Sequence, residues 1–83
     1  MKTIEYSKQA RKFLDRQTEA TRERIITAIN GIPERKGDIK RMEGGTGWRL
    51  RVGSYRVLFD ENGYIIFISR IKTRGDAYKG GKH

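Results

Sequence analysis

Three arginines, Arg49, Arg51 and Arg56, surround a Gly53-Ser54 pair in a stretch where apolar and polar residues alternate. This alternation around Gly-Ser is typical of two antiparallel strands joined by a two-residue turn. Such a turn puts Arg51 opposite Arg56 and all three arginines on one face, because successive side chains point to opposite faces. Like charges placed opposite each other destabilise a sheet. We therefore interpret this face as a surface that binds an anionic group; the alternative is a solvated face.

The available side chains favour phosphate chemistry over thiol, histidine or metal chemistry. The chain has no cysteine, and its single histidine is the last residue, His83. No carboxylates are clustered as metal ligands would be, so we expect no metal and no cofactor. Guanidinium groups bind phosphate with two parallel hydrogen bonds and stabilise charge that develops on it. With a tyrosine such as Tyr78 as general base or stacking group, they suit attack of a ribose 2′-hydroxyl on the adjacent phosphate.

The charge balance indicates an anionic partner. The 83 residues, enough for one domain, contain 19 Lys and Arg against 10 Asp and Glu, with a net charge of +9. We expect RNA, DNA, a ribonucleoprotein particle or an acidic protein as partner; a merely soluble basic surface is the alternative. No apolar run is long enough for a membrane span, and the N-terminus lacks the pattern of a signal peptide. We therefore expect a cytoplasmic protein.

Two helices are predicted between a short first strand and the arginine hairpin. The strand covers residues 2–6, Ser7 caps a helix over residues 8–16, and Thr18 caps a second helix that ends at Asn30. So short a link between helices predicts an antiparallel helical hairpin. Residues 34–47 are polar and glycine-rich, and we predict a loop with a helical turn near residues 38–42.

A second strand hairpin is predicted after the arginine hairpin. Asn62-Gly63 suits a type I′ turn, which would pair Phe59 with Ile66. Residues 64–71 form the last predicted strand, and its run from Tyr64 to Ile68 is apolar on both faces, which predicts the best-buried strand, in the middle of the sheet.

The predicted order of elements, β-α-α-β-β-β, defines an α+β fold. A helical hairpin would cover one face of a small, largely antiparallel sheet. We expect a single domain over residues 1–83, with residues 80–83 as a flexible tail. The covered face should carry the apolar residues of the arginine hairpin, which are Trp48, Leu50, Val52, Tyr55, Val57 and Phe59.

Three segments together resemble the RelE/ParE superfamily of toxins from bacterial type II toxin–antitoxin systems. They are Lys40-Arg41-Met42-Glu43-Gly44, the stretch from Trp48 to Phe59, and Thr73-Arg74-Gly75-Asp76-Ala77-Tyr78. With the two helices, the resemblance covers about residues 2–79. It implies a RelE-like fold and a ribosome-dependent endoribonuclease, or mRNA interferase, that cuts mRNA by 2′-hydroxyl attack and so arrests translation and growth. It also implies a cognate antitoxin, which we expect to be acidic and partly disordered.

The resemblance further implies roles for individual residues. Arg56 would hold the scissile phosphate, Arg74 would stabilise charge or assist the leaving oxygen, and Tyr78 would stack on a base or help activate the 2′-hydroxyl. Arg51 matches a basic residue on the strand before the turn and joins these three as a candidate catalytic residue. The residues expected to contact RNA are Arg49, Lys40, Arg41, Lys72 and Lys79.

Two other functions stay open on the sequence alone. A ParE-like toxin that poisons DNA gyrase without cutting RNA would not need the arginines and Tyr78 to converge. A non-catalytic basic module would serve only to bind the antitoxin.

Overall fold

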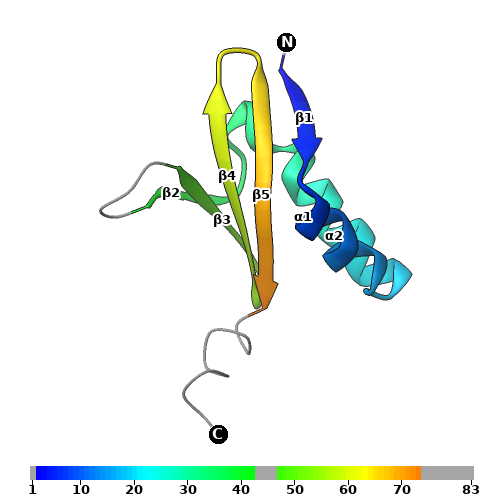
Figure 1. The fold of residues 1–83 in the computed structure, drawn as a ribbon. Helices are drawn as coiled ribbons and strands as arrows, with labels where there is room; N and C mark the ends of the chain where they lie inside the picture. The colour runs from blue at the N-terminus through cyan, green and yellow to red at the C-terminus, as the bar shows by residue number, and fades with distance from the viewer. Residues whose placement is uncertain (1, 43–46, 74–83) are drawn as a thin grey trace, which may run out of the picture.

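Two helices lie against one face of a five-stranded sheet in the computed structural model, which describes residues 2–42 and 47–73 (Figure 1). The chain order is β1 (Thr3–Tyr6), α1 (Lys8–Asp15), α2 (Glu19–Asn30), the short 3-10 helix η1 (Ile32–Glu34), β2 (Asp38–Arg41), β3 (Trp48–Val52), β4 (Tyr55–Asn62) and β5 (Ile65–Thr73). The strands are arranged β1-β5-β4-β3-β2. Only β1 runs parallel to its neighbour, so the predicted α+β class and largely antiparallel sheet are confirmed.

Both predicted helix caps are confirmed. The Ser7 hydroxyl oxygen accepts a hydrogen bond from the Ala10 amide at 3.1 Å, and the Thr18 hydroxyl oxygen accepts one from the Thr21 amide at 3.2 Å. Arg22 secures the link between the helices, because its guanidinium donates to the Leu14 carbonyl and, at 2.9 Å, to the Gln17 carbonyl. The Leu14 carbonyl, which also accepts from the Gln17 amide at 3.1 Å, thereby gains a further donor near the end of α1.

The hydrophobic core lies between the helices and the sheet. Apolar spacing on each helix turns one stripe toward the strands, and burial of this stripe supplies most of the favourable folding energy. The buried core residues are Ala10, Leu14, Ile25, Ile29, Ile32, Leu50, Val52, Val57, Phe59, Ile66, Ile68 and Ile71. Within the described ranges, no helix is both long and apolar enough to cross a membrane.

The predicted register of the arginine hairpin is confirmed. Arg51 is paired with Arg56, and Leu50 is paired with Val57. Gly53 begins the two-residue turn with a φ of 60°, while Ser54 is not among the residues with positive φ. A positive φ at the first turn position alone is the geometry of a type II′ turn, which glycine adopts without steric cost.

The predicted register between β4 and β5 is wrong. The turn residues are Gly63 and Tyr64, so Phe59 is paired with Ile68 and not with Ile66. Gly63, with a φ of 62°, takes the first position of this turn. The two-residue difference keeps Ile66 on the covered face, as predicted, because side chains alternate with a period of two.

A β-bulge at Ser69 changes the alternation along β5. Phe59 is paired with Ile68 and the preceding Leu58 with Arg70, which leaves Ser69 as the extra residue. The Ser69 hydroxyl donates to the Leu58 carbonyl at 3.1 Å. Since the bulge shifts the pattern by one residue, Ile68 and Ile71 are both buried although three positions separate them.

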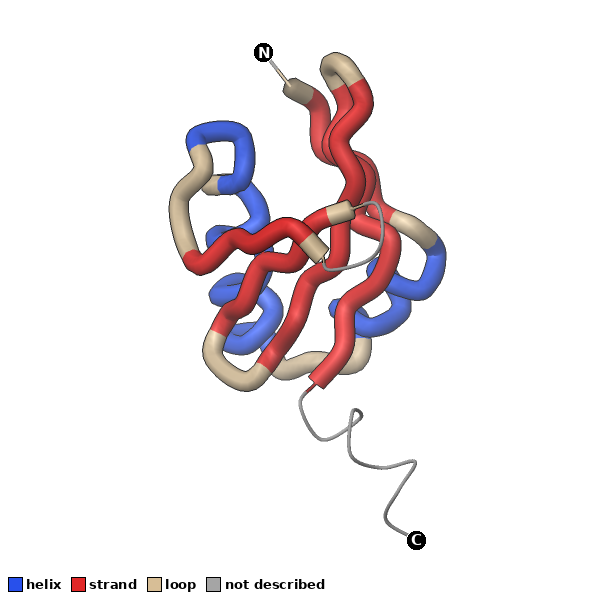
Figure 2. Tube along the Cα trace, turned by 90° about the vertical axis from the view of Figure 1, so that its left-hand side faces the viewer, coloured by secondary structure: helices blue, strands red, loops and turns tan. Residues whose placement is uncertain are grey.

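Strand β5 is an inner strand, as predicted, but it is not buried on both faces. Tyr64 is 77% exposed, and Ile65 and Phe67 are each 38% exposed. No described helix covers the second face of the sheet, which is termed the open face below. Figure 2 views the strands from that side.

Beyond the end of β1, side chains of Ser7 and Gln9 form hydrogen bonds with the backbone of β5. Ser7 donates from its hydroxyl to the Ser69 carbonyl at 2.8 Å. The Gln9 amide side chain donates to the Ile71 carbonyl at 3.1 Å and accepts from the Ile71 amide at 3.0 Å. These bonds give partners to backbone groups of β5 that the four-residue β1 is too short to reach.

The segment over residues 38–42 was predicted as a helical turn, and this prediction is wrong. Residues Asp38–Arg41 form the edge strand β2, with Ile39 paired to Leu50. The chain therefore has one strand more than the predicted β-α-α-β-β-β order. With Ile39 as its only apolar residue, β2 is held by its pairing with β3, which the local sequence does not reveal.

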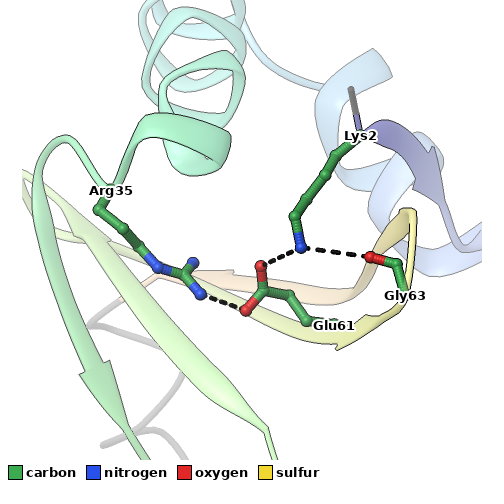
Figure 3. A network of polar contacts seen from close by, with 4 residues as sticks. All are labelled: Lys2, Arg35, Glu61 and Gly63. Atoms are coloured by element: carbon green, nitrogen blue, oxygen red, sulfur yellow. Dashed lines mark hydrogen bonds and ion pairs between the residues drawn. The ribbon is translucent and has the colours of Figure 1, made fainter.

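Glu61 joins three separate segments at the turn end of β4 (Figure 3). Its carboxylate forms ion pairs with Arg35, after η1, and with Lys2, at 3.3 Å, while Lys2 also donates to the Gly63 carbonyl at 3.2 Å. The hydrogen bond from Arg35 is the main cause that lowers the pKa of Glu61 below its ordinary value; burial opposes it, and the bond from Lys2 adds to it. The network ties the N-terminal segment to the β4–β5 turn.

Candidate functional site

Two rows of cationic side chains cross the open face of the sheet. The strand register aligns residues of β2, β3, β4 and β5 in two rows, which together are termed the basic grid. The first row is Asp38, Arg51, Arg56 and Lys72. The second row is Lys40, Arg49, Leu58 and Arg70. Six of these eight positions are cations and one is an acid. Like-charged neighbours across strands lower stability, so the fold itself gives no reason for the grid.

A hollow of about 300 Å³ lies over this grid. Five of its seven lining residues were predicted from the sequence to contact a phosphate or RNA: Lys40, Arg41, Arg49, Arg56 and Lys72. The other two, Leu58 and Met42, were not predicted. Leu58 had a usable signal, because its place in the alternation puts it on the same face as the arginines.

Arg56 and Lys72 are neighbouring cations that line the hollow. They are paired across β4 and β5, and both are half-buried. Within the part of the chain that the structure describes, no carboxylate forms an ion pair with either side chain. Two adjacent cations without a counterion are suited to bind one phosphate group.

Arg49 is held more firmly than its neighbours. Its Nη2 lies 3.7 Å from Oδ1 of Asp38, and its side chain is 20% exposed. Its Nε is buried and has no hydrogen-bond partner among the described residues. A buried donor without an acceptor is uncommon in folded proteins.

The remaining predicted residues lie elsewhere. Arg51 is exposed on the grid between Asp38 and Arg56, but it does not line the hollow. Arg41 lines the hollow and also stacks on the Trp48 ring, with its guanidinium carbon 5.4 Å from the ring centroid.

Three predicted site residues, Arg74, Tyr78 and Lys79, lie outside the described residues. The described part of β5 ends at Thr73, which is paired with Tyr55 next to Arg56. The sequence continues from there with Arg74.

The small α+β fold is similar to that of known toxins. Residues 4–78 match the model of the family described as the ParE toxin of the type II toxin–antitoxin system parDE. The chain therefore belongs to this toxin family. A Methanocaldococcus jannaschii protein provisionally named toxin RelE1 is 44% identical over 55 residues, and the match covers 60% of this chain and 59% of that protein. The match thus spans less than two thirds of the relative's length.

Solved RelE structures have a similar fold over most of the chain. The toxin–antitoxin complex RelB-RelE from Methanococcus jannaschii contains a chain that is 28% identical, with a TM-score of 0.73, over 89% of this chain and 94% of that one. The archaeal RelE-RelB complex from Pyrococcus horikoshii OT3 gives the same identity and TM-score, over 89% of this chain and 96% of that one. The resemblance to the RelE/ParE superfamily and its fold, predicted from the sequence, is confirmed.

Proposed function

We propose that this protein is the toxin of a RelBE-type toxin–antitoxin system and that it cleaves ribosome-bound mRNA in the cytoplasm. The reaction is attack of a ribose 2′-hydroxyl on the adjacent phosphate, which leaves a cyclic phosphate and a free 5′-hydroxyl. The main support is the hollow over the basic grid, where Arg56 and Lys72 lack a carboxylate partner among the described residues. The RelE relatives support the same class of toxin.

In this proposal Arg56 holds the scissile phosphate and Lys72 adds a second positive charge beside it. Charge on the phosphorane oxygens grows during the attack, and cations fixed in place stabilise the transition state more than the ground state. Arg49, which also lines the hollow, adds further positive charge beside the phosphate. Arg51 does not line the hollow but is paired with Arg56, and it strengthens the positive field there.

Arg74 and Tyr78 complete the proposed catalytic set. Arg74 stabilises charge or assists the leaving oxygen, and Tyr78 stacks on a base or helps to activate the 2′-hydroxyl. An arginine does not serve as a base because its pKa is too high. Lys40, Arg41 and Lys79 bind the flanking RNA.

We propose a cognate acidic antitoxin as the inhibitory partner. Both 28%-identical structural relatives are complexes with a RelB protein. A net charge of +9 favours an acidic chain, and a disordered antitoxin segment could fold as it covers the basic grid.

Gyrase poisoning is the second candidate function, because the matching family model describes ParE toxins. A gyrase poison needs no phosphate site on the open face. The hollow over the basic grid therefore favours RNA cleavage.

The two functions are separated by mapping mRNA 5′ ends after induced expression. One message is followed in translated and untranslated copies, with wild-type protein, with Arg56→Ala plus Tyr78→Phe, and with Arg11→Ala as a control on the exposed side of α1. Cuts confined to translated message, lost in the double variant and kept in the control, would establish a ribosome-dependent nuclease that uses Arg56 and Tyr78. Growth arrest with cleaved DNA and no mRNA cuts would support gyrase poisoning. Neither cuts nor arrest would leave a non-catalytic module.

A further inference from the structure

The chemistry of the open face changes at the bulge in β5. On the Arg70 side of Ser69 lie the two rows of the basic grid. On the other side, Phe67 is paired with Glu5 of β1 and with Asp60 of β4. This acidic row places one exposed carboxylate on either side of an aromatic ring, in a chain whose net charge is +9.

The charge pattern defines a direction across the sheet. The basic grid extends over β2, β3, β4 and β5, which at about 4.8 Å between strands is a track of roughly 14 Å. A nucleic acid strand carries a negative charge at every nucleotide, so it is attracted along this track. Glu5 and Asp60 repel phosphates from the adjacent row. A path along β5 would have to pass between these two carboxylates.

Leu58 is the only uncharged residue of the basic grid. It is half-buried, lines the hollow, and is paired with Arg49 on one side and Arg70 on the other. An apolar side chain between cations matches one nucleotide unit, in which a base with apolar faces is attached to a charged backbone. Leu58 is also outside the core, so packing against the helices does not explain it.

We propose that single-stranded RNA crosses the strands along the basic grid, with one unstacked base lying on Leu58, and that the acidic row marks the edge of this path. This inference rests on the proposed function only for the choice of RNA as the ligand. Phosphates on both sides of the seated base contact the cations of the hollow. The base on Leu58 belongs to an unpaired nucleotide, because a base paired with another strand would not be free to contact Leu58 in the hollow.

Phe67 is the obvious competitor as a platform for a base. It is aromatic and 38% exposed, and aromatic rings are the usual stacking partners of unpaired bases. Its neighbours Glu5 and Asp60 set it apart from Leu58, because a nucleotide seated there would bring its phosphate close to a carboxylate. The two positions therefore give opposite predictions for the route of the RNA.

The test measures binding of a fluorescein-labelled, single-stranded oligonucleotide with 2′-deoxy sugars, which cannot be cleaved by 2′-hydroxyl attack. A matched strand of abasic residues keeps the phosphates but lacks the bases. We expect Leu58→Ala to weaken binding of the normal strand about fivefold and to leave binding of the abasic strand unchanged. Phe67→Ala, the matched control on the same face, should change neither.

Salt dependence tests the direction of the path. Lys40→Gln and Lys72→Gln, at opposite ends of the track, should each reduce the slope of log K against log salt by about 0.7. Glu5→Gln plus Asp60→Asn should leave this slope unchanged, because phosphates do not cross the acidic row.

Three results would overturn the proposal: a loss of affinity with Phe67→Ala but not with Leu58→Ala, an equal loss on normal and abasic strands with Leu58→Ala, or no binding by the wild type at low salt. These outcomes are distinct from failure of the proposed function. Oligonucleotide binding with the expected pattern, in a protein that makes no cuts on ribosomes, would retain the path and reject the nuclease.

Discussion

The two faces of the sheet are built by opposite rules although the same strands form both. On the covered face, Leu50, Val57 and Ile68 are each no more than 1% exposed and pack against the helices. On the open face, the same strands present Arg51 opposite Arg56 and Arg56 opposite Lys72. The covered face lowers the free energy of the fold, and the open face raises it through repulsion. This contrast indicates that the covered face maintains the structure and the open face serves a ligand.

Two adjacent isoleucines of β5, Ile65 and Ile66, allow the two faces of the sheet to be compared directly. Ile66 is completely buried against the core, while Ile65 is 38% exposed on the open face. Ile66→Ala should lower the free energy of unfolding by about 2–5 kcal/mol, because it leaves a cavity. Ile65→Ala should cost less than about 1 kcal/mol. Urea unfolding followed by circular dichroism measures both, and equal losses would contradict the assignment of the two faces.

Ser7 tests how the covered side supports the bulge in β5. Its hydroxyl caps α1 and also donates to the Ser69 carbonyl. Ser7→Ala should destabilise the protein by about 1–2 kcal/mol, since it removes a helix cap and a second hydrogen bond. Thr18→Ala removes only a cap and is the matched control, with an expected loss of about 1 kcal/mol. Urea unfolding that shows no larger loss for Ser7→Ala would rule out a role for its bond to the bulge.

Glu61 gives the smallest of these stability effects, and its effect depends on pH. Because Arg35 and Lys2 lower the pKa of Glu61 in the folded protein, the ionised carboxylate stabilises the fold at any pH above the ordinary carboxyl pKa. Glu61→Gln should lose up to about 1 kcal/mol at neutral pH. The difference from wild type should shrink as the pH falls through the lowered pKa of Glu61, and thermal melts over an acid pH series would reveal it. A difference that stays constant with pH would show that the ion pairs contribute nothing.

The sequence predicts local structure well where apolar and polar residues alternate along a strand and the turn that follows has two residues. The pairing of Arg51 with Arg56 follows from the Gly-Ser turn, and the caps at Ser7 and Thr18 follow from residue type. The register of β5 could not be predicted in the same way. Either Asn62-Gly63 or Gly63-Tyr64 can form a two-residue turn, and the bulge at Ser69 is set by its contacts with β4 and Ser7.

The sequence predicted most residues of the candidate site but not the hollow that they line. Five of the residues that line the hollow were identified by their charge and position. The strand β2, which brings Lys40 beside Arg49, was missed because its four residues carry only one apolar side chain. The apolar run over residues 64–68 suggested burial on both faces, whereas no described helix covers Phe67, which is 38% exposed. The number of layers in a fold is a property of the whole chain, and a single strand does not encode it.

The claim that the open face is kept for a ligand is tested most directly by measuring stability and cleavage on the same protein. The variant is Arg51→Gln plus Arg56→Gln, with Arg11→Gln as a control on α1. We predict that the double variant has an unchanged or slightly higher free energy of unfolding, by up to about 0.5 kcal/mol, while cleavage of translated mRNA falls at least about a hundredfold. A loss of more than about 1 kcal/mol in stability, or full cleavage by the double variant, would contradict the account.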